Sequence, residues 1–254
     1  MADTVRQHDF DRYFTALFAP AEKRDALFAL YAFNHELARA REVASEPHLA
    51  LVRLHWWREA VKGAAKRHPV ADAIAQALAA DDLLATDLLT DLLGMIDSRE
   101  AESGHEIATI ADWQAYLLGT AGGLAVAAGR LLGMGEPEAL RPLGAAYGAA
   151  GVLRAVPALA RRGRCLLPAD VLAGHGLCPE AVVSGADPSA AIRALVKVGR
   201  AFLCPITLPR AAIAAALPAV LARRDLARLP APLVPRALGD KLAVTWAALR
   251  GGIG

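Results

Sequence analysis

The sequence predicts an all-α protein, and two observations lead to that prediction. Alanine, leucine, arginine and glutamate dominate while runs of β-branched residues are scarce, a composition that favours helices. Hydrophobic residues make up 55% of the 254 positions and charged residues 21%, which supports a sizeable core and argues against disorder. Because no repeat, low-complexity segment or compositional shift marks a linker, we expect residues 1–254 to form a single helical domain.

Proline and glycine positions divide the chain into nine expected helices. Pro20 suits the first turn of a helix that runs to about residue 46, and Pro47 is expected to end it. The remaining helices are expected at residues 48–67, 69–80, 82–102, 110–132, 136–160, 187–203, 206–223 and 235–250. Residues 161–185 hold four glycines and two prolines, so we expect this stretch to be irregular.

Charge, hydropathy and cysteine spacing indicate in which compartment the protein lies and which classes of partner it is expected to bind. The net charge of +2 gives no reason to expect nucleic-acid binding. The N-terminus has neither a signal-peptide nor a transit-peptide pattern, and three cysteines without close spacing fit a reducing compartment. The most apolar stretch, residues 115–129, is shorter than the roughly 20 residues of a membrane span. We therefore expect a cytoplasmic protein that does not span a membrane but could touch its surface.

One carboxylate pair has the spacing of metal ligands. Asp87 and Asp91 stand four residues apart on an expected helix and could share a Mg²⁺ ion. The alternative, which the pattern favours, is that neighbouring leucines such as Leu88 and Leu92 face the core while the aspartates form a solvated edge.

A basic cluster follows the expected helix at residues 136–160. Arg161, Arg162 and Arg164 form either a solvated surface run or a grip on a phosphate, because guanidinium groups match phosphate oxygens.

Three segments together resemble the squalene/phytoene synthase family. They are residues 20–33 (PAEKRDALFALYAF), 53–58 (RLHWWR) and 160–168 (ARRGRCLLP), and the likeness extends over roughly residues 9–250. The resemblance implies a single all-α bundle of the trans-isoprenoid synthase type around a deep central cavity. It also implies head-to-head joining of two prenyl diphosphates, held through Mg²⁺ by two aspartate-rich motifs on facing helices.

The two motifs are degenerate in this chain. The first falls on residues 38–42 (ARARE), where Ala38 replaces an aspartate and Glu42 is the remaining carboxylate. The second falls on residues 154–159 (RAVPAL), where Ala155 and Leu159 replace aspartates and Pro157 is expected to disturb the helix. One carboxylate cannot hold a cluster of divalent ions. We therefore expect no catalytic residue, no metal and no cofactor.

The departures themselves resemble a non-enzymatic branch of the family. Residues 33–38 (FNHELA), 96–100 (IDSRE) and 153–157 (LRAVP) are similar to that branch, whose members assist the assembly of respiratory complex I. This resemblance implies an assembly factor that is peripheral at the inner membrane and acts on complex I subunits or assembly intermediates.

Two other functions stay open at this point. The first is a Mg²⁺-dependent prenyltransferase with relocated ligands, which would be drawn from Glu42, Asp87, Asp91, Asp97, Glu100 and Glu102. The second is a binder of isoprenoids or lipids without turnover. In that case an anionic head group would be held directly by Arg154, Arg161, Arg162 and Arg164. A long apolar tunnel would support the second function, whereas a cavity filled by side chains would not.

Overall fold

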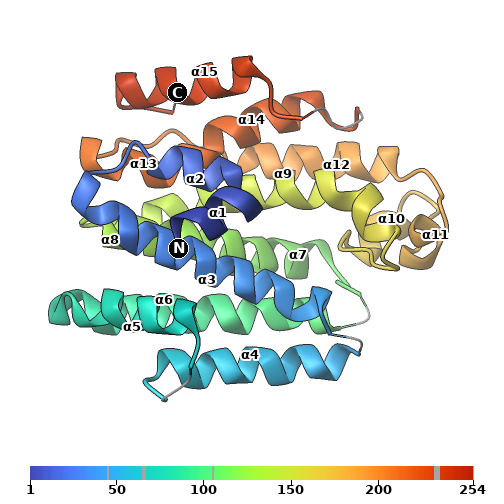
Figure 1. Ribbon diagram of the computed structural model, residues 1–254. Helices are drawn as coiled ribbons and strands as arrows, with labels where there is room; N and C mark the ends of the chain where they lie inside the picture. Colours follow the sequence, from blue (N-terminus) through green and yellow to red (C-terminus); the bar gives the residue numbers. More distant parts are fainter. Residues whose placement is uncertain (45, 65–66, 105, 232–234, 254) are drawn as a thin grey trace.

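The computed structural model describes residues 1–44, 46–64, 67–104, 106–231 and 235–253. Within these ranges the chain forms helices and connecting segments and no strand, so the predicted all-α class is confirmed (Figure 1). The longer helices are α3 (Arg24–Glu42), α4 (Pro47–Val61), α5 (Pro69–Ala79), α6 (Asp82–Arg99), α9 (Arg141–Ala160), α12 (Ser189–Ala201), α14 (Pro218–Arg228) and α15 (Leu238–Arg250). The expected helix at 110–132 consists of α7 (Ile110–Leu117), the π-helical turn η3 (Leu118–Gly122) and α8 (Gly123–Leu131).

Helix α9 lies in the middle of the bundle and packs against α7, α8, α12 and α14. Small residues make this packing close: a Cβ added to Gly144 would stand 2.3 Å from the Ala121 carbonyl oxygen. In the described part of the chain one stretch, Pro137–Ala160, has the length and hydropathy of a membrane span. Its place among four other helices is that of a core helix.

Two of the expected proline effects differ from the structure. Helix α3 already ends at Glu42, and Pro47 begins α4, where a missing backbone N–H leaves no bond unmade. Pro157 does not end α9, which continues to Ala160. Pro157 is exposed and three residues from the helix end, so the ring removes one hydrogen bond near the C-terminus without breaking the helix.

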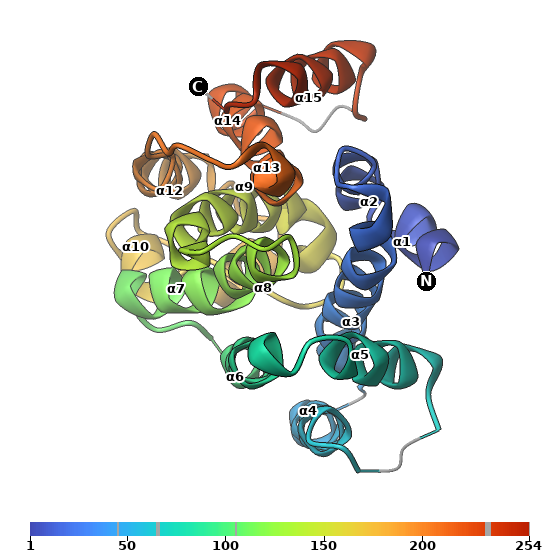
Figure 2. The same ribbon diagram turned by 90° about the vertical axis from the view of Figure 1, so that its left-hand side faces the viewer.

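The N-terminal segment forms two short helices that the sequence did not predict, α1 (Ala2–His8) and α2 (Phe10–Ala16). Helix α1 ends just before Asp9 and α2 begins just after it. The Asp9 carboxylate accepts a hydrogen bond from the backbone N–H of Arg12 and caps α2. Helix α2 lies beside α3 and α13 (Ile213–Ala216), as Figure 2 shows. The stretch expected to be irregular contains two five-residue helices, α10 (Ala169–Ala173) and α11 (Pro179–Val183).

The centre of the bundle, where α2, α3, α8, α9 and α13 meet, is almost filled. Arg12, Tyr31 and Tyr147 enter it together with small apolar side chains, and the remaining cavity has a volume of about 10 Å³. That volume is about the size of one water molecule. At this point among the described residues there is no deep cavity of the kind that the family resemblance implies, because Arg12, Tyr31 and Tyr147 occupy the space.

Candidate functional site at the two motif helices

The residues predicted to stand at the two motif positions lie on α3 and α9, and an ion pair joins the ends of these two helices. Ala38 is half-buried on α3, and Ala155 and Leu159 are half-buried in the last turns of α9. Glu42 is exposed at the end of α3, and its carboxylate lies 3.1 Å from the guanidinium of Arg162, directly after α9. The one carboxylate left in the first motif thus faces an arginine that follows the second motif.

A buried polar cluster lies beside this pair, and we call it the Glu102 cluster: Asn34, Arg99, Glu102, Tyr116 and Arg164. Arg99 donates hydrogen bonds to Glu102 and to the side-chain oxygen of Asn34. The Tyr116 hydroxyl donates to Glu102 over 2.7 Å, and Arg164 donates to its other carboxylate oxygen over 3.2 Å. The Glu102 carboxylate therefore joins α6, α7 and the segment after α9, and Arg99 links it to α3 through Asn34.

The charge state of the Glu102 cluster follows from its surroundings. Burial raises the pKa of Glu102, but the charge of Arg99, the Tyr116 hydrogen bond and the charge of Arg164 outweigh burial and hold the pKa below its usual range. Burial and the Glu102 charge raise the pKa of Tyr116. Glu102 is therefore ionised at neutral pH and its oxygens are already bonded to protein donors.

A second group of ion pairs surrounds Asp225 of α14. Arg236 donates two hydrogen bonds to Asp225, of 2.6 and 2.8 Å, and Arg154 of α9 donates one of 2.9 Å. Arg236 also donates to Asp11 of α2 over 2.9 Å, and the Tyr147 hydroxyl donates to the same oxygen over 3.1 Å. This chain of contacts ties the N-terminal segment, α9, α14 and the segment before α15 to one another.

Arg12 fills the centre of the bundle with a charged side chain. Its guanidinium lies 2.7 Å from Asp9 and 4.7 Å from the centroid of the Tyr147 ring. Burial lowers the pKa of Arg12, but the Asp9 charge and hydrogen bond together with Tyr147 and Tyr31 outweigh burial, and the net shift of the pKa is upward. Burial also raises the pKa of Tyr31 to about 12. The centre therefore holds a permanent cation and neutral phenols.

The other carboxylates considered as relocated metal ligands also contact arginines. Arg130 donates to Asp87 over 2.8 Å and to Asp91 over 2.7 Å. Arg58 of α4 donates to Asp97 and, over 2.9 Å, to Glu100. Among the described residues no group of three or more histidine, cysteine, aspartate or glutamate side chains could hold a metal ion. The carboxylates around the motif helices thus use guanidinium groups as their counter-ions.

The Asp87 and Asp91 edge is only partly as the sequence predicts. Leu88 and Leu92 face the core, with 3% and 0% of their surface exposed, which confirms that part of the prediction. Asp91 is not solvated, because 6% of its side chain is exposed and Arg130 covers it. Burial raises the pKa of Asp91 despite the opposing effect of Arg130.

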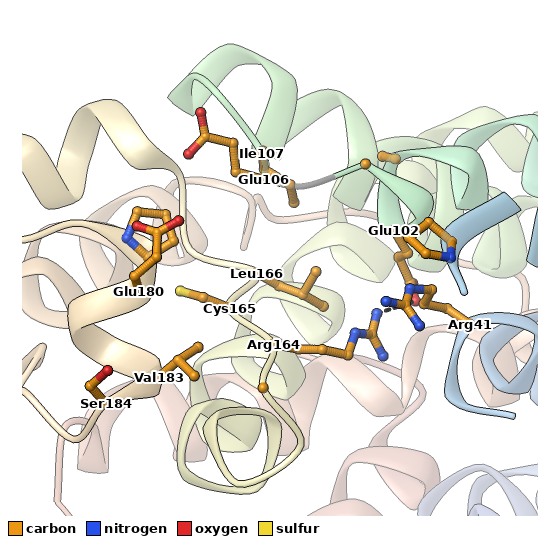
Figure 3. Close-up of a pocket in the computed structure, with 15 residues that line it drawn as sticks. Arg41, Glu102, Glu106, Ile107, Arg164, Cys165, Leu166, Glu180, Val183 and Ser184 are labelled. Atoms are coloured by element: carbon orange, nitrogen blue, oxygen red, sulfur yellow. Dashed lines mark hydrogen bonds and ion pairs between the residues drawn. The ribbon is translucent and has the colours of Figure 1, made fainter. Parts of the chain in front are cut away.

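The four arginines proposed to hold an anion do not converge on one site. Arg164 borders a recess of about 280 Å³, where Glu102, Glu106 and Glu180 contribute negative charge, as Figure 3 shows. Arg154 and Arg161 border a different recess, of about 510 Å³. Arg162 belongs to neither set of lining residues and pairs with Glu42.

Sequence reasoning missed the arginines that neutralise the carboxylates. Arg12, Arg99 and Arg130 were not singled out, nor was Arg236. Two of them carried a local signal, since Asp9 and Arg12, and Arg99 and Glu102, stand three residues apart in the sequence. Arg130 and Arg236 pair across the fold and had no such signal.

The chain matches the profile of the squalene/phytoene synthase family over residues 5–233. That match includes both motif helices and ends before α15.

The chain is similar to curated proteins named NADH dehydrogenase (ubiquinone) complex I, assembly factor 6. The human protein is 28% identical over 186 residues, which is 70% of this chain and 55% of the relative. The Bos taurus protein is 30% identical over the same length with the same coverage. The Drosophila melanogaster homolog is 26% identical over 192 residues, which is 70% of this chain and 56% of the relative. The chain thus matches about half the length of these relatives.

Two solved structures with the same fold are synthases. A dehydrosqualene synthase in complex with a ligand superposes with a TM-score of 0.75, at 14% identity, over 98% of this chain and 94% of that one. Squalene synthase HpnC from Alicyclobacillus acidocaldarius superposes with a TM-score of 0.61, at 15% identity, over 98% and 92%. At these identities the likeness establishes the trans-isoprenoid synthase fold.

Proposed function

We propose that this chain, which belongs to the squalene/phytoene synthase family, is a non-catalytic assembly factor for respiratory complex I. The observation that carries the proposal is that the carboxylates are already paired. Each of the six that could replace the missing aspartates contacts an arginine. The pairs are Glu42 with Arg162, Asp87 and Asp91 with Arg130, Asp97 and Glu100 with Arg58, and Glu102 with Arg99 and Arg164. The names of the relatives support the same function.

The residues present do not fit a cluster of Mg²⁺ ions bound to diphosphate. Such ions need several free carboxylate oxygens that face one another, because Mg²⁺ demands a near-octahedral set of oxygen ligands. At the motif positions Ala38, Ala155 and Leu159 offer none, and the oxygens of Glu42 lie against Arg162. The fold is thus retained while the groups that would bind the leaving diphosphate are replaced.

On this proposal the protein acts near the inner membrane that holds complex I, as a peripheral protein facing the cytoplasm or an equivalent compartment. Its partners are complex I subunits or assembly intermediates. The filled centre supports a role in protein contact, because a space of about 10 Å³ has no room for an isoprenoid chain.

Deletion of the gene in its native host tests this function. We expect NADH:quinone oxidoreductase activity to fall and the fully assembled complex to be depleted on native gels, with both restored by the wild-type chain. A deletion strain with normal assembly of the complex would contradict the proposal. A tagged chain should also co-purify with complex I subunits.

The alternative of a relocated Mg²⁺-dependent prenyltransferase makes a separate prediction. It requires divalent-ion binding, which Mn²⁺ titration followed by electron paramagnetic resonance measures directly. On the proposed function no Mn²⁺ is bound beyond weak surface association. Replacing Arg130 by methionine frees Asp87 and Asp91 and serves as a positive comparison for binding by unpaired carboxylates.

A further inference from the structure

The outer face of α15 carries a stripe of exposed apolar side chains. Leu238, Leu242, Trp246 and Leu249 follow one another at spacings of four, four and three residues, which places them on one side of the helix. Their exposed fractions are 71%, 58%, 59% and 64%. Exposed apolar side chains scattered singly need no explanation, whereas three leucines and a tryptophan on one helix face form a patch that signals an interaction site.

The exposure does not come from a loosely attached helix. The opposite face of α15 buries Val244, Ala247 and Ala248 in the core. Asp240 of α15 is only 1% exposed. It accepts hydrogen bonds from two arginines of α14, Arg224 over 2.6 Å and Arg228 over 2.9 Å. These contacts fix α15 on α14 and hold the stripe outward, where α15 forms the outermost layer of the molecule (Figures 1 and 2).

The charges around the stripe have one sign. Lys241 and Arg250 lie on either side of it, and the Arg250 guanidinium stands 4.9 Å from the centroid of the Trp246 ring. On α14, Arg223 and Arg228 are exposed as well. The two acidic residues of α14 and α15, Asp225 and Asp240, are buried in ion pairs. The exposed charges of these two helices are therefore all positive.

The patch continues onto the N-terminal segment. The exposed ring of Phe10, at the start of α2, lies 5.1 Å from the Lys241 ammonium. Helices that lie in a membrane interface have a similar surface: large apolar and aromatic side chains with basic side chains on either side. Tryptophan is enriched at that depth because its ring is amphipathic.

We propose that the outer face of α15, with Phe10, docks on a bilayer surface that contains anionic phospholipids. The leucines and Trp246 enter the boundary between head groups and acyl chains, and Lys241 and Arg250 contact lipid phosphates. A second copy of the chain fits this face poorly, because two-fold pairing would bring the same basic side chains together. The proposal goes beyond the assembly function and does not depend on it.

Vesicle binding by the purified full-length chain tests the proposal. The wild type should sediment with vesicles of phosphatidylcholine and phosphatidylglycerol and much less with phosphatidylcholine alone. L242Q/W246Q should weaken binding to the mixed vesicles by about tenfold or more, because two apolar side chains no longer enter the bilayer. K241E/R250E should weaken it by about tenfold and remove the preference for anionic lipid.

The matched control is L51Q/V52Q on α4, which also removes two exposed apolar side chains but lies on a helix far from α15 in Figure 1. It should bind vesicles like the wild type. Brominated lipid should quench wild-type fluorescence, and W246F should lose most of that quenching. Circular dichroism checks that each variant is folded.

Three results would overturn the proposal. The first is a wild type that stays in solution with mixed vesicles. The second is full binding by folded L242Q/W246Q. The third is a wild-type dimer in analytical ultracentrifugation that becomes a monomer in L242Q/W246Q, because a second copy would then cover the face. None of these measurements involves complex I, so this proposal and the assembly function fail independently.

Discussion

The interior around the motif helices and the outer face of α15 differ in how far their side chains are satisfied by the protein itself. Inside, Glu102 meets two arginines and a tyrosine, and charge is buried only with its partner. Outside, four large apolar side chains of α15 are more than half exposed, and none of the described residues covers them. The interior is thus complete by itself, whereas α15 presents a surface that requires something beyond the chain.

The largest expected effect comes from removing the central carboxylate of the Glu102 cluster. Glu102→Gln leaves Arg99 and Arg164 buried without their counter-charge, so we expect a loss of about 3–5 kcal/mol in the free energy of unfolding. Urea denaturation followed by circular dichroism measures it. A loss below about 1 kcal/mol would mean that water reaches the cluster and that the interior is less complete than described.

Close packing of α9 against η3 gives the next effect. Gly144→Ala places a Cβ against the Ala121 carbonyl oxygen, and overpacking of this kind costs about 1–3 kcal/mol. Gly151→Ala on the same helix is the control, because open space surrounds its Cβ position. There the gain in helix propensity should stabilise the protein by roughly 0.5–1 kcal/mol. Equal effects at both positions would contradict the packing described for the centre.

The pH dependence of stability separates two buried carboxylates. The pKa of Glu102 is lower in the folded than in the unfolded chain, so its contribution is present above the unfolded pKa and is lost as the pH falls through the folded pKa. The pKa of Asp91 is raised by folding, so the folded chain binds this proton more tightly than the unfolded chain. Asp91 therefore makes folding more favourable as the pH falls through the folded pKa, which is the opposite of Glu102.

Chemical denaturation between neutral and acidic pH should therefore show a shallower acid loss in Glu102→Gln than in the wild type. Asp91→Asn should show a steeper one. If the two variants changed the slope in the same direction, one of the two assigned environments would be wrong.

The smallest effects are expected at the surface. Arg162→Ala removes the ion pair with Glu42, whose side chains are 60% and 41% exposed, and should cost less than about 1 kcal/mol. L242Q/W246Q should change the unfolding free energy by no more than about 0.5 kcal/mol, because the replaced side chains contact solvent. Thermal unfolding of each variant checks this. A large loss in L242Q/W246Q would show that the stripe packs on the protein itself.

The sequence predicted the fold better than the site. Helix-forming composition and proline positions predicted the main helices, because these signals are local. The short helices α1 and α2 were missed, because seven residues show little periodicity. The cap that Asp9 gives to α2 forms only when the chain already has the helical turn. The sequence placed Ala38, Ala155 and Leu159 at the motif positions, and the loss of the motif aspartates stays a prediction.

What replaced those carboxylates could not be read from the sequence. The contacts of Arg130 with Asp87 and of Arg236 with Asp225 join residues that only the packed bundle brings together.

Release of pyrophosphate from farnesyl or geranylgeranyl diphosphate, measured with folded wild-type chain and Mg²⁺, tests the central claim most directly. The account predicts no release above that of buffer with Mg²⁺, because arginines occupy the carboxylates that would hold the metal. Mg²⁺-dependent release that scales with the amount of protein would contradict it and would make the chain an active prenyl-diphosphate enzyme.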